Sequence, residues 1–222
     1  MASLSPALLI FDIDGTLFQT HLVTVPAVQR TFADFGLPIP ADEKIRSFFG
    51  RPVAEYEDWL AEQCPPEQAA QIVEATNQKE LALVGETGEL YPGVRELLQK
   101  LFETGHCLAI CSNGPVAYVA EFVRAHGLTP LFRKVLARGT HYESKTVMAA
   151  EVRDEFPGLP LVVIGDRQDD IEAAHALGGV AVAAAYGFGA EHELCGAEVV
   201  IHAFGELPGA LRALLPAHFK GE

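Results

Sequence analysis

Hydrophobic residues in this chain form short uninterrupted runs rather than alternating with polar residues. These runs are rich in β-branched residues and cover 7–13, 107–112, 133–137, 161–166 and 180–185. A strand with one face in water alternates polar and apolar residues, so uninterrupted runs indicate strands buried on both faces. Segments with apolar residues three and four positions apart lie between the runs and predict helices at 94–105, 116–127 and 145–156. Alternating strands and helices predict a doubly wound, Rossmann-like α/β core with a parallel sheet.

One long segment interrupts this alternation. Between about residues 18 and 88 there is no strand-like run, only helical stretches separated by proline and glycine. A connection of this length inside a compact domain is usually functional. We therefore predict an all-helical cap domain at 18–88, inserted into a catalytic core made of 1–17 and 89–222.

Composition and charge narrow the classes of function. The chain has 222 residues, 49% of them hydrophobic, and no apolar run near the ~20 residues that a membrane span needs. Sixteen basic residues against thirty acidic ones give a net charge of -14, which argues against nucleic acid because phosphate backbones require clustered Lys and Arg. The N-terminus lacks the basic region of a signal peptide, and the four cysteines lack zinc spacing. We expect a cytoplasmic monomer or homodimer whose partner is a small molecule, with no membrane or nucleic-acid partner.

Aspartates follow two of the predicted strands. Asp12 and Asp14 come after the first strand, and residues i and i+2 of an extended segment point the same way, so their carboxylates crowd one site. Asp166 follows another strand, and Asp170 shares its face if a helical turn begins there. We assign Asp169 to complementing the helix dipole. Ligands bind at the carboxyl ends of such strands, and oxygen-only clusters suit Mg²⁺, so these acids predict a magnesium site.

Donors for a phosphate follow the second predicted strand. Ser112, Asn113 and Gly114 precede Pro115, a favourable first residue of a helix. Exposed backbone N–H groups, the helix dipole and a hydroxyl therefore converge at one strand end. This arrangement predicts phosphate binding at Ser112 and Asn113, although as an isolated motif it is also ordinary helix capping.

Four motifs carry a resemblance to a known family. They are FDIDGTL at 11–17, CSNG at 111–114, the lysine in ESKTVMAAEV at 143–152 and VIGDRQDDIEAA at 163–174. In this order and spacing they resemble the motifs of the haloacid dehalogenase superfamily, specifically its helical-cap phosphatases of the phosphoglycolate phosphatase and β-phosphoglucomutase type. The resemblance spans nearly the whole chain.

The resemblance implies a mechanism. Asp12 would be the nucleophile that forms an aspartyl-phosphate, and Asp14 would protonate the leaving oxygen and then activate water. Mg²⁺ would be held by Asp12, the backbone carbonyl of Asp14 and Asp166, with Asp170 acting through a water. Ser112 and Lys145 would bind the transferred phosphoryl group. The expected metal ligands are thus Asp12, Asp14, Asp166 and Asp170, and the expected phosphate-binding residues are Ser112, Asn113 and Lys145.

Several alternatives stay open from the sequence. Lys145 could be an ordinary exposed lysine, in which case Lys134 is the other candidate. Arg51 lies between Gly50 and Pro52 in the cap, where a loop could bring it onto the leaving group, or it is an exposed arginine at a helix end.

The identity of the substrate is also open. Gln19 replaces the acidic residue that phosphatases of the phosphoglycolate type and their mutase relatives often carry, which weakens an assignment to phosphoglycolate itself. We expect a Mg²⁺-dependent phosphatase of a small phosphorylated metabolite, and the alternative is a sugar-phosphate mutase. A dehalogenase would not need Asp14 or the metal-binding acids, and a non-catalytic protein would not need every catalytic position filled.

Overall fold

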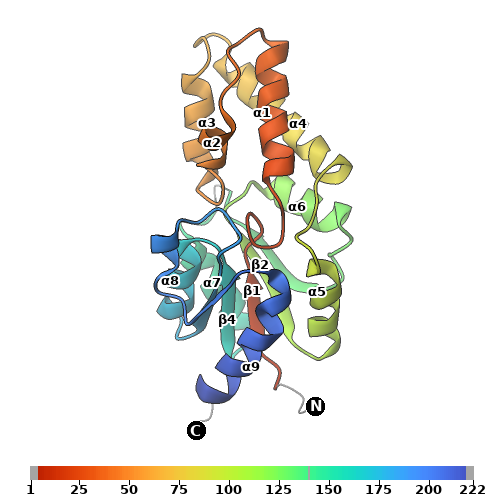
Figure 1. Ribbon diagram of the computed structural model, residues 1–222, viewed down its shortest axis with the longest axis vertical. Coiled ribbons are helices and arrows are strands. Elements are labelled where there is room, and N and C mark those ends of the chain that lie inside the picture. The colour runs from red at the N-terminus through yellow and green to blue at the C-terminus, as the bar shows by residue number, and fades with distance from the viewer. Residues whose placement is uncertain (1–4, 140, 219–222) are drawn as a thin grey trace.

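A six-stranded parallel sheet forms the centre of the protein in the computed structural model (Figure 1). The structure describes residues 5–139 and 141–218. The two ends of the predicted core, residues 1–4 and 219–222, therefore lie outside the described residues. The sheet order is β3-β2-β1-β4-β5-β6. The strands are β1 (Leu8–Phe11), β2 (Cys107–Ser112), β3 (Phe132–Ala137), β4 (Leu161–Gly165), β5 (Val180–Ala184) and β6 (Val199–Ile201).

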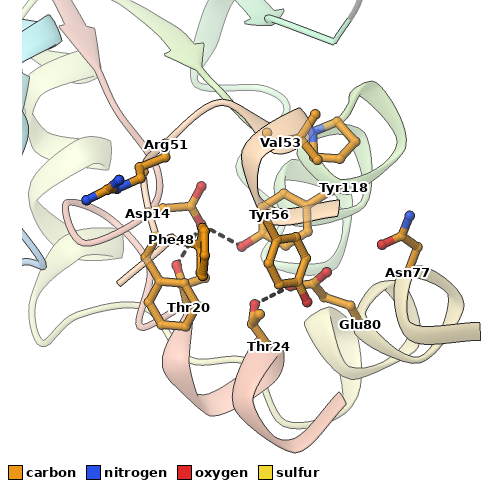
Figure 2. A pocket seen from close by; sticks show the side chains of 14 residues that line it. Asp14, Thr20, Thr24, Phe48, Arg51, Val53, Tyr56, Asn77, Glu80 and Tyr118 are labelled. Carbon is orange, nitrogen blue, oxygen red and sulfur yellow. Dashed lines mark hydrogen bonds between the residues drawn. The ribbon is translucent and has the colours of Figure 1, made fainter. Parts of the chain in front are cut away.

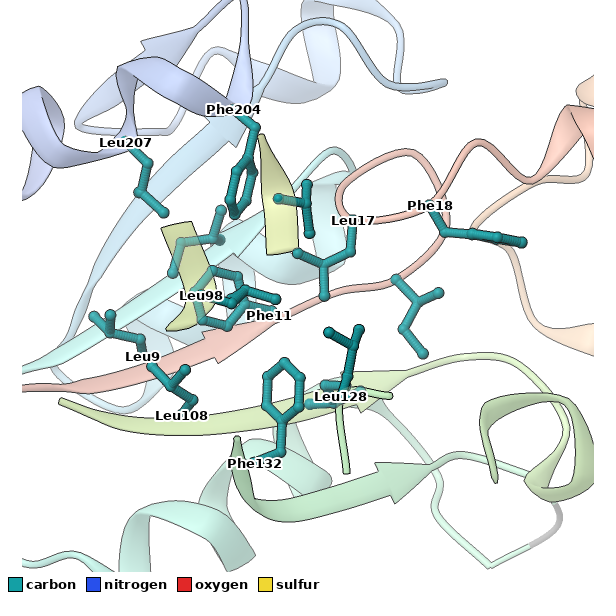
Figure 3. Packing of buried hydrophobic residues seen from close by; sticks show 14 of the residues in the cluster. Leu9, Phe11, Leu17, Phe18, Leu98, Leu108, Leu128, Phe132, Phe204 and Leu207 are labelled. Carbon is teal, nitrogen blue, oxygen red and sulfur yellow. The ribbon is translucent and has the colours of Figure 1, made fainter. Parts of the chain in front are cut away.

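Helices cover both faces of this sheet. On one face lie α5 (Val94–Glu103), α6 (Val116–Ala125) and α9 (Leu207–His218), and on the other lie α7 (Lys145–Glu155) and α8 (Gln168–Ala176). Consecutive residues of β1 point to opposite faces, so Leu9 and Phe11 pack in one hydrophobic cluster (Figure 3) and Leu8 and Ile10 pack in the other. Burial on both faces confirms the α/β fold class that the uninterrupted apolar runs predict.

Five helices lie between β1 and β2, and the first four of them stand beyond the carboxyl ends of the strands (Figure 1). These four are α1 (His21–Asp34), α2 (Asp42–Arg46), α3 (Val53–Glu62) and α4 (Ala69–Glu86). These helices share a hydrophobic cluster of their own, which includes Phe32, Trp59 and Ile72. Phe18 packs instead in the core cluster, so this residue at the start of the predicted cap contacts the core, and the exact domain boundaries stay a prediction.

The first strand is shorter than its apolar run. It ends at Phe11 because the next residues turn: the N–H groups of Leu17 and Phe18 both donate to the carbonyl oxygen of Ile13 at 2.9 Å. Gly15 adopts a φ of +84° in this turn, a conformation that glycine takes without steric cost.

The sequence prediction missed β6. It has only three residues at the edge of the sheet, where two of them are not buried, so it lacks the long apolar run of the other strands. The remaining elements are two short 3₁₀ helices at Glu191–Leu194 and Phe204–Glu206. In the part of the chain that the structure describes, none of the helices combines the length and apolar character needed to cross a membrane.

Candidate active site

The sheet topology brings the predicted site residues together. β1 pairs with β2 on one side and β4 on the other, with Phe11 opposite both Ile110 and Ile164. The chain therefore leaves neighbouring strands at one edge, the position where open α/β sheets bind ligands. Asp12, Ser112 and Asp166 follow or end these three strands, and all three are buried.

Lys145 lies at the centre of this cluster. Its ammonium donates to Asp12 Oδ1 at 2.9 Å and to Asp170 Oδ1 at 2.8 Å, and the side chain is 1% exposed. Lys134, the other candidate, instead pairs with Glu151 and Glu155 away from the aspartates. Burial opposes the charge of Lys145, yet the surrounding carboxylates raise its pKa well above the ordinary value, so the ammonium stays protonated.

The carboxyl groups carry more buried negative charge than this lysine can balance. Among the described residues, four aspartates are buried, Asp12, Asp14, Asp166 and Asp170, beside a single buried lysine. Burial raises the pKa of Asp12 to about 6 and that of Asp166 to about 8, although Lys145 opposes both shifts. Burial likewise raises the pKa of Asp170. Repulsion between the carboxylates adds to the effect of burial, and a cation between these groups would stabilise their charged forms against both.

The geometry fits such a cation. Carboxylate oxygens of Asp12, Asp166 and Asp170 all lie within 4.8 Å of one another. Asp12 Oδ2 and Asp166 Oδ1 are buried and have no hydrogen-bond partner in the described structure, which makes them free to coordinate a metal ion. Both oxygens of Asp170 already accept hydrogen bonds, from Lys145 and from the backbone N–H of Arg167. All of these candidate ligand atoms are carboxylate oxygens, which are the ligands that Mg²⁺ prefers.

The chain around Asp166 and Asp170 is shaped to let these carboxylates approach. Asp166 Oδ2 accepts hydrogen bonds from the N–H groups of Phe188 at 2.6 Å and Gly189 at 3.2 Å, which orient the free Oδ1. A side chain at Gly165 would collide with the Asp170 carboxyl group, and one at Gly15 would collide with that of Asp166. These two glycines therefore leave the space that the acid cluster occupies.

Asp14 has a separate environment. Its Oδ1 accepts hydrogen bonds from Thr20 Oγ1 at 2.6 Å and from the Tyr118 hydroxyl at 2.7 Å. Burial raises the pKa of Asp14, and these two hydrogen bonds oppose the rise. Sequence reasoning missed both donors. The only available signal was that Tyr118 lies in the first turn of the helix that follows Ser112 and Asn113.

Asn113 has a different set of contacts from the one that its predicted role suggests. Its side-chain amide donates to the carbonyl of Gly50 in the cap at 2.9 Å and to Asp169 Oδ2 at 2.7 Å. Ser112 Oγ accepts a hydrogen bond from the N–H of Gly114 at 3.1 Å. The side chain of Asn113 thus joins core and cap, and phosphate binding at Ser112 and Asn113 stays a prediction.

Asp169 does more than our dipole assignment implies. It lies in the first turn of α8, as that assignment requires. Its carboxylate also lies 3.5 Å from the Lys145 ammonium and accepts the hydrogen bond from Asn113. The assignment to the helix dipole alone is therefore incomplete, because a partner more than fifty residues away in the sequence cannot be inferred from helix position.

Cap and core enclose a cavity beside Asp14 (Figure 2), of about 70 Å³. Arg51 lies on its wall, with a side chain 45% exposed and 3.7 Å from Glu55. Arg51 therefore lies at the rim of the cavity and is partly exposed to solvent. This position agrees with both interpretations from the sequence, a contact with the leaving group and an exposed arginine at a helix end.

Gln19, the residue that replaces the acidic one of the phosphoglycolate type, donates a hydrogen bond to the carbonyl of Leu90, where the chain returns from the cap.

A doubly wound α/β fold with a helical cap and a cluster of aspartates around one lysine defines a class of phosphate-handling hydrolases. Residues 9–185 match the profile of the haloacid dehalogenase-like hydrolases. The chain belongs to this family.

Individual relatives narrow the class further. The phosphoglycolate phosphatase of Caulobacter vibrioides is 32% identical over 96% of this chain and 93% of that protein. The phosphoglycolate phosphatase of Synechococcus elongatus is also 32% identical, over 85% of this chain and 88% of that protein. A crystal structure of a predicted phosphoglycolate phosphatase from Haemophilus somnus has the same fold, with a TM-score of 0.82 at 22% identity over 92% of this chain and 97% of that chain. The protein is a phosphatase similar to the phosphoglycolate phosphatases.

Proposed function

We propose that the protein is a Mg²⁺-dependent phosphatase that hydrolyses a small phosphorylated metabolite through an aspartyl-phosphate on Asp12. The observation that carries the proposal is the buried Asp12, which has one oxygen bonded to Lys145 and the other without a partner in the described structure. The bond to Lys145 holds the Asp12 carboxylate in one orientation at the strand end, which is the arrangement that a carboxylate nucleophile needs. The membership in the hydrolase family supports the same reaction class.

The proposed metal site is formed by Asp12, Asp166 and Asp170, together with the backbone carbonyl of Asp14. The unpartnered oxygens of Asp12 and Asp166 support direct ligation, and the occupied oxygens of Asp170 support a contact through water. When bound, Mg²⁺ would neutralise charge on the carboxylates and on the phosphoryl oxygens.

The proposed reaction has two displacements. In the first, a carboxylate oxygen of Asp12 bonds to phosphorus, the bond from phosphorus to the ester oxygen breaks, and Asp14 gives its proton to that oxygen. In the second, water attacks phosphorus while Asp14 takes its proton, and the bond to Asp12 breaks to release phosphate. Lys145 and the Ser112 hydroxyl would stabilise the negative charge of the phosphoryl group in both steps. The hydrogen bonds of Asp14 to Thr20 and Tyr118 support its role, because they hold the carboxyl group in one orientation.

The alternative is a sugar-phosphate mutase, which would use the same residues and return the phosphoryl group to the substrate. The relatives named phosphoglycolate phosphatase favour hydrolysis. A panel of about a hundred phosphorylated metabolites, incubated with Mg²⁺, distinguishes the two, because a phosphatase releases free phosphate and a mutase yields an isomeric phosphate ester. An absence of both products with every compound and with p-nitrophenyl phosphate contradicts the proposal. The cytoplasmic location and the monomeric or homodimeric state stay predictions.

A further inference from the structure

The cavity beside Asp14 has polar groups on its cap side that the proposed phosphoryl chemistry does not use. Its wall includes Phe48, Phe49 and Tyr118, and its cap side includes Tyr56 and Glu80 (Figure 2). A single water needs roughly 10–15 Å³ of such space, so about 70 Å³ has room for a small organic group. Because Asp14 would protonate the leaving oxygen, the group attached to that oxygen would extend into this cavity.

Tyr56 presents a hydroxyl with no partner. The residue is 8% exposed, and its hydroxyl oxygen makes no hydrogen bond to any residue that the structure describes. The same hydroxyl lies near negative charge, since Glu80 and Glu57 add to the burial that raises the pKa of Tyr56. A buried hydroxyl without a partner is costly unless a ligand or water completes it.

Glu80 places a carboxyl group at the same end of the cavity. It accepts a hydrogen bond from the Thr24 hydroxyl, and no lysine or arginine within residues 5–139 and 141–218 forms an ion pair with it. Burial, with a smaller contribution from the nearby Asp14, raises the pKa of Glu80 to about 7, although the hydrogen bond from Thr24 opposes the rise. Arg51, the arginine of this cavity, lies at the rim beside Glu55 and not beside Glu80.

These surroundings select among leaving groups. A carboxylate in the cavity would lie near the carboxylate of Glu80, and among the described residues that line the cavity none is a buried cation that could balance it. Like charges in a desolvated site repel. A hydroxyl can donate to Glu80 and bond to Tyr56, while its carbon chain packs on the aromatic wall. We propose that the leaving group of the substrate is a small polyol rather than a carboxylic acid, and that Glu80 is the residue that determines this specificity. This inference rests on the proposed phosphatase function.

The test compares kcat/KM for glycerol 3-phosphate and 2-phosphoglycolate at pH 8, with Mg²⁺ and the full-length chain. We expect the wild type to favour glycerol 3-phosphate at least tenfold. Glu80→Gln keeps the shape and removes the charge, so we expect it to reduce that ratio about tenfold, mainly through a higher kcat/KM for 2-phosphoglycolate. Glu74→Gln removes a charge from an exposed position of the same helix and serves as the control, with an unchanged ratio.

Tyr56→Phe provides an independent measurement. We expect about a fivefold lower kcat/KM for glycerol 3-phosphate and little change for p-nitrophenyl phosphate, since one hydrogen bond to the polyol is lost. A wild-type preference for 2-phosphoglycolate, or the same ratio in wild type and Glu80→Gln, would overturn the inference while leaving the phosphatase function intact. Absence of phosphate release from all substrates, p-nitrophenyl phosphate included, would contradict the phosphatase function itself.

Discussion

The hydroxyl of Tyr118 donates a hydrogen bond to Asp14 Oδ1 over 2.7 Å, although the two residues are 104 positions apart in the chain. The bond joins the first turn of α6 to the segment after β1. Thr20 donates to the same oxygen, so Asp14 is held from two sides. The proposed acid and base is thus oriented by two residues that line the cavity.

This arrangement predicts the effect of Tyr118→Phe. The variant keeps the ring but loses one of the two bonds that orient Asp14, so we expect kcat to fall about tenfold with little change in KM. Steady-state kinetics on an alkyl phosphate measures this loss. Tyr142→Phe is the matched control, because its hydroxyl bonds to Glu151 on the exposed surface. An equal loss in both variants would assign the effect to general destabilisation.

Replacement of Asp14 tests its role in the chemistry. Asp14→Asn removes a proton donor, and we expect a rate loss on the order of 10²–10⁴ with an alkyl phosphate, whose leaving oxygen needs a proton. With p-nitrophenyl phosphate the first step suffers less, so phosphate accumulates on Asp12. Mass spectrometry of acid-quenched protein detects this adduct, and the Asp12→Asn/Asp14→Asn double variant lacks it. No adduct and equal losses on both substrates would make Asp14 a structural residue.

Metal dependence is a third prediction. We expect phosphate release from p-nitrophenyl phosphate to require Mg²⁺ or a similar hard cation and to cease in excess EDTA. Asp166→Asn should weaken Mg²⁺ binding as measured by isothermal titration calorimetry, because it removes the charge of a carboxyl group with an unpartnered oxygen. Asp154→Asn, at an exposed position of α7, is the control. Full turnover in EDTA would contradict the metal site.

Arg51 is tested by the choice of substrate. Its place at the rim of the cavity predicts that Arg51→Ala lowers kcat/KM for the natural substrate far more than for p-nitrophenyl phosphate, since a contact to the leaving group is lost and phosphoryl binding is not. Arg124→Ala removes an arginine of the exposed surface and should leave both values unchanged. If Arg51→Ala affects both substrates equally, Arg51 is an exposed arginine that makes no contact with the substrate.

The raised pKa of Glu80 predicts a dependence of stability on pH. The folded protein binds the Glu80 proton with a pKa of about 7, whereas the unfolded chain has the ordinary value of 4.5. This group therefore stabilises the fold fully below about pH 4.5, and that contribution is lost as pH rises toward 7. We expect the free energy of unfolding of the wild type, relative to Glu80→Gln, to fall by about 2 kcal/mol over this range. Urea unfolding at a series of pH values measures it, and a pH-independent difference would contradict the raised pKa.

Local patterns accounted for most of the fold. Uninterrupted apolar runs located β1, β2, β4 and β5 because a strand that is buried on both faces needs apolar residues at every position. The run at 133–137 also located β3, although this strand carries Arg133 and Lys134 and is only partly buried. The apolar runs failed for β6, which has only three residues at the sheet edge, two of them not buried. The same local logic placed Asp12 and Asp166 at strand ends, and the parallel topology then brings those ends together.

The sequence by itself therefore determined the order of strands and helices and the polar residues at the strand ends. Both of these features depend on residues that are close together along the chain. The tertiary structure decided between the two candidate lysines, because Lys145 and Asp12 are 133 positions apart and only packing brings them together. It also decided that Asn113 bonds to Gly50 in the cap and that Glu80 lies near Asp14. These contacts depend on how the cap packs on the core, and no periodicity along the chain specifies the distance between two segments that only packing brings together.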